Sequence, residues 1–330
     1  MYCSLVTGGA GFIGSHVAQN LIRNGHKVII LDNLSGGFKD NVPEGVALIQ
    51  GSVTDKSLVE RIFGEHRIDY VYHLAAYAAE NLSHFIRRYN YETNLIGSIN
   101  LINASILHEV KCFVFTSSIA VYGRNQLPMT EEIVPIPIDP YGVSKLAVEQ
   151  DLRAAHDIFG LPHIVFRPHN VYGEGQNIAD KYRNVIGIFM NSILQNKPMP
   201  VFGTGLQTRA FSYIGDMAPI IAGAVRNERA YNHVFNIGAD EVCSVKALAG
   251  MVARAMGVES QIQYLPARDE VEHAYPSHEK IARIFGLAKT TALEEGLKRM
   301  AAWAKRVGAR KSRDFEGIEI RKNLPSAWAK

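Results

Sequence analysis

Cysteine is scarce in this 330-residue chain, and the cysteines it does have form no pattern. Cys3, Cys112 and Cys243 are far apart, odd in number, and each lies in or beside an apolar segment. Such positions are typical of small buried hydrophobic residues rather than of disulfides or thiolate ligands. The twelve histidines are scattered and show no metal-ligand spacing. The sequence therefore predicts no disulfide framework and no metal site.

Long apolar runs and a strong charge imbalance are also missing. No apolar stretch reaches the roughly 18 residues of a membrane-spanning helix, and the N-terminus lacks the charged start and apolar core of a signal peptide. The formal net charge is only +3, and the basic stretch 305–313 has no aromatic residues between its charges. We therefore expect a cytoplasmic protein with neither a membrane nor a nucleic acid as partner.

Short apolar runs alternate with amphipathic stretches through the first half of the chain. The apolar runs lie at 2–7, 27–32, 46–50, 70–74, 111–116 and 163–167, and the amphipathic stretches include 12–24, 55–63, 89–108 and 140–159. This rhythm predicts an α/β fold, with a Rossmann-type doubly wound parallel sheet covered by helices on both faces. After residue 172 the rhythm breaks. We expect one domain from 1–172 plus about 211–240, and a smaller C-terminal α/β domain from 173–210 plus about 241–330.

A glycine-rich turn, "VTGGAGFIG" at residues 6–14, joins the first predicted strand to the first predicted helix. Gly8 permits a tight turn, Gly11 lets a pyrophosphate approach the backbone, and Gly14 allows the helix to pack closely on the strand. The helix N-terminus supplies free N–H groups and the positive end of a dipole. Asp32, at the end of the second strand, can accept from both ribose hydroxyls and would repel a 2′-phosphate, which favours NAD over NADP.

Four segments carry a resemblance to a known family: "TGGAGFIGS", "HLAA" at 73–76, "SSIAVYG" and "PYGVSK". Together they resemble the extended short-chain dehydrogenase/reductases, specifically the nucleotide-sugar epimerases and dehydratases, and most of all the UDP-glucose 4-epimerases. The resemblance implies that the NAD cleft is also lined by Phe12, Ile13, Asn33, Ser52, Val53, Leu74, Ala75 and Ala76. One departure is Gly51-Ser52, where the family commonly has Gly-Asp with the aspartate bonding adenine.

The segment "DPYGVSK" predicts a helix that begins at Pro140 with Asp139 as its N-cap. Tyr141 and Lys145 are four residues apart and therefore share one helix face. The lysine ammonium and the positive end of the helix should both lower the pKa of the phenol, which makes Tyr141 a candidate base. Ser118, at the tip of its strand, can hydrogen-bond the same substrate hydroxyl. The resemblance implies that Tyr141 takes a proton from a sugar hydroxyl while that carbon gives a hydride to NAD.

The stretch "VFTSSIAVYG" at 114–123 has no acid, base or thiol between Ser118 and Tyr122. Related 4,6-dehydratases carry Asp-Glu or Ser-Glu where Ile119-Ala120 stands, decarboxylases carry a glutamate at the second position, and 3,5-epimerases carry a cysteine there. Ala120 has no ionisable atom and can move no proton. The reaction that needs no such group is 4-epimerisation, in which a 4-ketosugar turns over and takes the same hydride back on its other face.

Two alternatives to a 4-epimerase stay open at this point. Glu80, Asn81 or His84, in the loop after "HLAA", can supply the missing acid or base, which would favour a dehydratase, a decarboxylase or a 3,5-epimerase. A non-catalytic NAD-binding regulator is the third reading, although such proteins tend to lose the tyrosine and lysine. The pair of helices at 89–108 and 140–159 resembles the dimer contact of the family, so we expect a homodimer.

The same resemblance implies a nucleotide-sugar site in the later part of the chain, and the expected substrate is a UDP-linked sugar. Asn170 and Arg209 match diphosphate-binding residues, as does Arg268, and Glu270 matches a ribose ligand in a segment one residue shorter than usual. Val201 should lie against the base. Ala274 falls where epimerases restricted to plain hexoses have a tyrosine, which predicts room for an N-acetyl group. If the deletion lies elsewhere, Tyr275 takes this position and the inference inverts.

Overall fold

A seven-stranded parallel sheet forms the larger half of the protein. The computed structural model describes residues 1–267, 271–286, 290–312, 314–325 and 328. The strands run in the order β11-β6-β5-β4-β1-β2-β3, and every pairing is parallel. Their bounds are β1 Cys3–Thr7, β2 Lys27–Asp32, β3 Ala47–Gln50, β4 Tyr70–His73, β5 Cys112–Thr116, β6 His163–Pro168 and β11 His233–Ile237. The predicted α/β, Rossmann-type fold class is confirmed.

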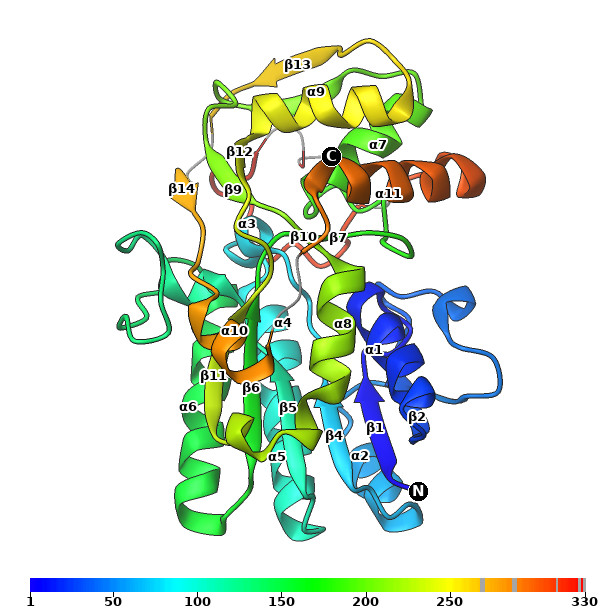
Figure 1. Cartoon of the computed structure of the whole chain (residues 1–330), viewed down its shortest axis with the longest axis vertical. Helices are drawn as coiled ribbons and strands as arrows, with labels where there is room; N and C mark the ends of the chain where they lie inside the picture. The colour runs from blue at the N-terminus through cyan, green and yellow to red at the C-terminus, as the bar shows by residue number, and fades with distance from the viewer. Residues whose placement is uncertain (268–270, 287–289, 313, 326–327, 329–330) are drawn as a thin grey trace.

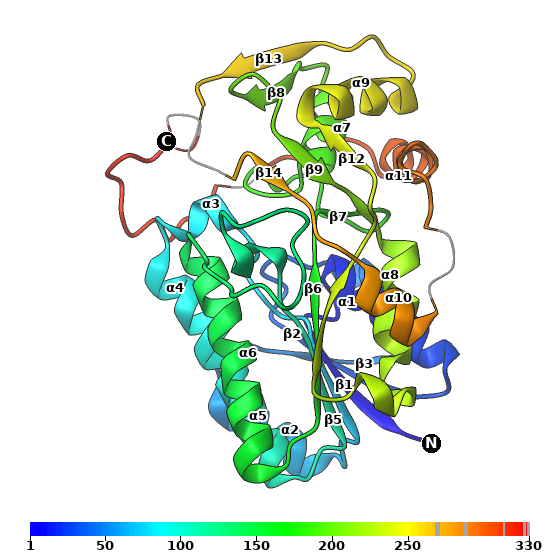
Figure 2. The same cartoon turned by 60° about the vertical axis from the view of Figure 1, so that its left-hand side comes forward.

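Helices cover both faces of this sheet because side chains alternate along each buried strand. Leu5 and Ile29 belong to one buried cluster, while their neighbours Val6 and Ile30 belong to another. Figure 2 shows α5 and α6 along one face and α8 along the other. The covering helices are α1 Phe12–Arg23, α8 Ile214–Gly223 and α10 Glu279–Phe285 on one face, and α2 Lys56–Glu65, α5 Gly97–Leu107 and α6 Pro140–Phe159 on the other.

The amphipathic stretch predicted as one helix at 89–108 is divided in the structure. A short helix α4, Arg87–Tyr91, leads into a π-helical turn at Glu92–Ile96 and then into α5. The buried Asn94 lies in this turn, and its amide accepts from the backbone N–H of Tyr77 at 2.8 Å and donates to the Tyr77 carbonyl at 3.2 Å. A π turn widens the helix locally. Here it holds the loop that follows β4.

A smaller group of elements lies at the carboxyl ends of the large sheet, at the top of Figure 1. It contains the pairs β8 Met199–Phe202 with β13 Ile262–Leu265 and β7 Val171–Tyr172 with β10 Ser212–Tyr213, and the triplet β12 Val242–Ser244, β9 Thr208–Ala210 and β14 His273–Ala274. Its helices include α7 Val185–Leu194, α9 Val245–Met256 and α11 Leu293–Val307. Helix α3, Glu80–Ser83, follows β4 beneath them.

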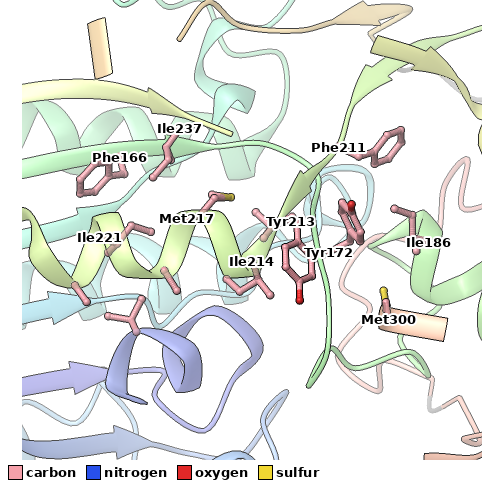
Figure 3. Close-up of a cluster of buried hydrophobic side chains, with 14 of the residues drawn as sticks. Phe166, Tyr172, Ile186, Phe211, Tyr213, Ile214, Met217, Ile221, Ile237 and Met300 are labelled. Atoms are coloured by element: carbon pink, nitrogen blue, oxygen red, sulfur yellow. The ribbon is translucent and has the colours of Figure 1, made fainter. Parts of the chain in front are cut away.

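One buried cluster runs from the large sheet into this smaller group without a break. Figure 3 shows Met217 and Ile221 of α8 against the sheet, and Tyr172 next to Tyr213 further along the same cluster. Met300 of α11 belongs to it as well. The two halves are therefore packed through shared apolar side chains, which fixes the walls of the space between them.

The C-terminal segment, residues 314–325, contacts the loop after β4 and helix α4, and its described residues form no strand. The Phe315 ring lies 5.1 Å from the rings of both Tyr77 and Tyr89. Glu319 accepts from the backbone N–H groups of Arg88 and Tyr89 at 2.9 Å. Among the residues that the structure describes, no helix has both the length and the apolar character needed to cross a membrane.

Candidate active site

A large cavity follows the carboxyl ends of β1 to β6 and is bounded on its far side by the smaller group of elements. Most of the site residues predicted from the sequence line it: Gly8, Gly11, Phe12, Ile13, Gly14, Asp32, Asn33, Ser52, Val53, Leu74, Ala75, Ala76, Ser118, Tyr141, Lys145, Asn170, Val201 and Arg209. Ligands of open α/β sheets bind at this edge. The cavity therefore brings the predicted cofactor residues and the predicted catalytic residues together.

The glycine turn is built so that two backbones come close. Gly8 has φ +71°, and a Cβ there would lie 2.7 Å from the backbone nitrogen of Ala75. A Cβ on Gly14 would collide with the Gly8 carbonyl. Helix α1 begins after Gly11 with no side-chain cap, so its first N–H groups have no partner within the helix. This end of α1 opens on the cavity and fits a phosphate group.

Asp32 is buried and fixed by the backbone around the turn. Its carboxylate accepts from the N–H of Ala10 at 3.0 Å and of Leu34 at 2.7 Å. A carboxylate has about four acceptor positions, so two are left for the hydroxyls of a ribose. Ser52 also lines the cavity, but its hydroxyl is hydrogen-bonded to that of Thr54 at 2.8 Å. The donors and acceptors present fit an adenine dinucleotide without a 2′-phosphate.

Tyr141 and Lys145 lie in the first two turns of α6, whose start is as predicted. Asp139 caps the helix by accepting from the N–H of Gly142 at 2.9 Å, and Pro140 is its first residue. Lys145 Nζ donates to the carbonyl of Thr116 at 2.8 Å and lies 5.8 Å from the centre of the Tyr141 ring. The Ser118 hydroxyl accepts from the N–H of Ala120 at 3.1 Å and is close enough to the Tyr141 phenol to lower its pKa.

The electrostatics of the pair differ from the sequence-based expectation. Burial raises the pKa of the Tyr141 phenol, the charge of Glu80 raises it further, and Ser118 opposes the rise. The predicted lowering of this pKa is therefore wrong for the protein alone. Burial also lowers the pKa of Lys145 to about 7, against the opposing charge of Glu149. Both shifts favour the neutral forms because both groups are removed from water.

A buried ion pair that the sequence analysis missed lies one helical turn beyond Lys145. Glu149 accepts from Arg167 Nε at 2.9 Å and from Nη2 at 2.5 Å, and it also accepts from the Ser117 hydroxyl. The side chains of Arg167 and Glu149 are 4% and 3% exposed. The signal available in the sequence was the four-residue spacing from Lys145 to Glu149 on one helix face.

The predicted nucleotide-sugar residues are partly brought together. Asn170 and Arg209 line the cavity, and both side chains are tied to the backbone: Asn170 donates to the Ala210 carbonyl at 2.9 Å, and Arg209 donates to the carbonyls of Thr208 and Glu272 at 2.8 and 2.9 Å.

Three further predicted positions are not among the described cavity-lining residues. Ala274 is buried in a cluster with Val121, Tyr122 and Met129 and is not among the cavity-lining residues. The predicted ligands Arg268 and Glu270 lie outside the described residues.

The loop after β4 adds acidic and polar groups to the cavity. Glu80 and Asn81, which were open alternatives for the missing acid or base, both line it, whereas His84 is not among the lining residues. Arg183 lines it too and was not predicted. It comes from the loop before α7, where nothing in the local pattern marks it, so only the fold brings it to the site.

A glycine turn that accepts a dinucleotide, beside a serine, tyrosine and lysine, defines the class of Rossmann-type dehydrogenase-like proteins. The profile described as "NAD dependent epimerase/dehydratase family" matches residues 4–238. The chain belongs to this NAD-dependent family, and its cofactor is NAD.

Relatives in this family are similar along almost the whole chain. A Methanocaldococcus jannaschii protein with the provisional name of a UDP-glucose 4-epimerase is 36% identical over 304 residues, covering 91% of this chain and 98% of the relative. The crystal structure of the Thermotoga maritima UDP-glucose 4-epimerase with UDP-glucose has a TM-score of 0.86 at 35% identity, covering 92% of this chain and 99% of that one.

A relative with a different named activity matches over a similar length. The UDP-N-acetyl-alpha-D-glucosaminuronate decarboxylase of Bacillus cytotoxicus is 28% identical over 322 residues, covering 92% of this chain and 98% of the relative. The overall likeness therefore gives the family and the class of substrate, and the choice among reactions depends on particular residues.

Proposed function

We propose that this protein is an isomerase, an NAD-dependent 4-epimerase of a UDP-hexose that interconverts UDP-glucose and UDP-galactose. The observation that carries the proposal is the turn Ile119–Tyr122, which follows Ser118 and has no ionisable side chain in its first three residues. The 36% and 35% identical relatives named as UDP-glucose 4-epimerases support it.

The roles of the chain's own residues follow from their positions. Tyr141 takes the proton from the sugar 4-hydroxyl and later returns it, while Ser118 orients that hydroxyl. Lys145 supplies positive charge that stabilises the phenolate as it forms. NAD, when bound, supplies the hydride acceptor. Asp32, Gly8, Gly11 and the first turn of α1 would hold the dinucleotide, and closure of the cavity keeps water from the 4-ketosugar.

Asn170, Arg209, Val201, Arg268 and Glu270 are proposed as the ligands of the UDP group. Arg209 supports this assignment because it is a guanidinium on the cavity wall, and its planar fork suits phosphate oxygens. Ala274 does not line the cavity. Tolerance of an N-acetyl group is therefore a question for the substrate test alone.

A second candidate reaction is favoured by Glu80. This carboxylate lines the cavity and is close enough to Tyr141 to raise its pKa. Positioned in this way, it could move a proton on a carbon next to the ketone, as a 4,6-dehydratase, a 3,5-epimerase or a decarboxylation site requires of its acid–base group. A non-catalytic regulator has no need of the buried Tyr141–Lys145 pair and is the weakest candidate.

Solvent deuterium separates these reactions. The purified protein is incubated with UDP-glucose or UDP-N-acetylglucosamine in D₂O without added NAD, and products are resolved by ion-exchange chromatography and mass spectrometry. Direct hydride return gives the 4-epimer with no carbon-bound deuterium. A dehydrated product, or deuterium on carbon, would show proton transfer at a neighbouring carbon and reject the proposal.

Two variants complete this test. Glu80→Gln should leave 4-epimerisation within about threefold of wild type if the carboxylate is not part of the reaction. Tyr141→Phe should abolish turnover, by a factor of about 10² to 10⁴ for loss of a general base. If Glu80→Gln loses activity as completely as Tyr141→Phe, the second candidate reaction is the better one.

We also propose that the protein is a homodimer formed through α5, α6 and the turn between α4 and α5. Ile96, Leu107, Val143, Ile158 and Phe159 on these elements are large apolar side chains with 40% or more of their surface exposed. A second copy would cover such a face. Sedimentation velocity at two protein concentrations checks this state.

A further inference from the structure

Arg183 is a cation on the cavity wall whose position the proposed reaction does not explain. It lies between β7 and α7, in the part of the chain that crosses over the cavity. Its Nε donates to Asp180 at 2.6 Å, and its guanidinium lies 5.0 Å from the centre of the Tyr77 ring. The side chain is 18% exposed. Among the described residues, no protein acceptor is found for its Nη1 and Nη2 groups.

These two nitrogens lie beside the loop that packs on the glycine turn. A Cβ on Gly36 would lie 3.0 Å from Nη2 of Arg183. A Cβ on the next residue, Gly37, would lie 2.5 Å from the Ala10 carbonyl oxygen and 2.8 Å from the Gly11 nitrogen. The guanidinium is therefore one loop residue away from the turn that opens α1. The guanidinium and the start of α1 both line the same cavity.

The other cations on the cavity wall are already occupied by the protein. The lining residues of the described chain include three lysines or arginines: Lys145, Arg183 and Arg209. Lys145 donates to the Thr116 carbonyl, and Arg209 is bound to backbone carbonyls at the other end of the cavity. Arg183 alone combines a place near the glycine turn with two terminal amino groups not bound by the protein.

We propose that Arg183 binds the pyrophosphate of NAD and closes the cofactor cleft from the side opposite α1. A guanidinium fork matches two phosphate oxygens, and Asp180 and the Tyr77 ring hold its plane in place. The first turn of α1 supplies N–H donors from one side, and Arg183 supplies the positive charge from the other. The dinucleotide is then held by residues from both halves of the protein.

The C-terminal segment supports the loop that carries Arg183. The Tyr182 hydroxyl accepts from the backbone N–H of Phe315 at 3.1 Å, and Lys181 Nζ is bonded to Asp314 at 2.5 Å. Because Phe315 also contacts Tyr77, the residues on either side of the guanidinium are braced by the same segment. Arg183 is thus fixed before the cofactor binds, which lowers the entropy that binding would otherwise cost.

The proposal rests on NAD being the cofactor, not on the 4-epimerase reaction, so its test needs no turnover. NAD bound to the purified holoprotein is chased with excess ADP-ribose, and the release rate is followed without any nucleotide sugar. Arg183→Gln should release NAD roughly 10- to 100-fold faster, the loss typical of a hydrogen-bonded charge pair. Arg183→Lys should fall between Gln and wild type.

Lys197→Gln is the matched control. It also removes one positive charge, but Lys197 is an exposed residue after α7 that neither lines the cavity nor braces the Arg183 loop, so its release rate should stay within about twofold of wild type. The salt dependence of the release rate distinguishes loss of an ionic contact from general loosening of the structure. Release from wild type should accelerate between about 0.05 and 0.5 M NaCl, and release from Arg183→Gln should respond much less, because salt screens the ionic contact.

Three outcomes would overturn the proposal. The first is release from Arg183→Gln at the wild-type rate. The second is faster release with the full salt dependence of wild type, which would indicate general loosening. The third is unchanged NAD release together with weaker binding of UDP-glucuronate, but not of UDP-glucose. In that last case the cation recognises a carboxylate on the sugar.

Discussion

Replacing Glu149 with glutamine should strongly destabilise the protein, although the change is nearly isosteric. The carboxylate neutralises Arg167 deep in the structure, where the two side chains are 4% and 3% exposed. Removing one member of a buried pair leaves an uncompensated charge and costs about 3–5 kcal/mol. No other acceptor stands ready to replace the carboxylate, since Arg167 Nη1 is already buried without a hydrogen-bond partner among the described residues.

A surface pair of similar geometry serves as the control. Arg88 and Glu92 are an i,i+4 pair with side chains 83% and 50% exposed, so Glu92→Gln should cost no more than about 0.5 kcal/mol. Unfolding in guanidinium chloride, followed by circular dichroism at the same NAD concentration, measures the free energy of unfolding of Glu149→Gln and of Glu92→Gln. Unchanged slopes would show that the native and denatured states stay comparable in compactness.

The reasoning is refuted if Glu149→Gln costs as little as Glu92→Gln. It predicts in addition that Arg167→Gln, added to Glu149→Gln, recovers part of the loss, because the double variant buries no net charge. The alternative outcome is that adding Arg167→Gln to Glu149→Gln lowers the free energy of unfolding as much as Arg167→Gln does in wild type. That outcome would mean that packing, and not charge, sets the effect.

Two further predictions concern the other catalytic and cofactor elements. Lys145 has an ordinary pKa of 10.5 and a folded pKa of about 7. Between these pH values the unfolded state therefore binds more protons than the folded state, and stability rises with pH. Relative to Lys145→Met, the free energy of unfolding of wild type in urea should rise by about 2 kcal/mol from pH 7 to pH 9. A difference that is independent of pH would contradict this. Gly14→Ala should yield protein with little bound NAD, because its Cβ meets the Gly8 carbonyl, whereas Gly64→Ala, in open space on α2, should keep the cofactor and be slightly more stable.

The large sheet was predictable because the composition of each strand reflects the burial of its two faces. A strand covered by helices on both faces must be apolar on both, so 111–116 and 163–167 appear as unbroken apolar runs. The corresponding β5 and β6 differ from these limits by one residue at most. The divided helix after residue 87 was not predictable, because the π turn is set by the contact of Asn94 with Tyr77, seventeen residues away.

The same distinction applies to the site. The glycine turn and the Tyr141–Lys145 pair are local patterns, in which spacing along the chain fixes spacing in three dimensions. The partners of Glu149 and Arg183 are set by packing between distant segments. Sequence spacing gave no sign that Arg183 would face Gly36, or that the C-terminal segment would contact Tyr77.

The pKa shifts of Tyr141 and Lys145 oppose the expected phenolate, yet they are compatible with the proposed role of Tyr141 as a base. Burial penalises each charge separately, raising the pKa of the phenol and lowering that of the amine to about 7. A proton that moves from the phenol to a neutral lysine leaves the pair with no net charge, so much of the penalty for an isolated phenolate is avoided. Near pH 7 about half of the molecules hold a neutral Lys145, by its pKa. We expect the phenolate to form only as an ion pair with Lys145, so that the two groups act together as the base.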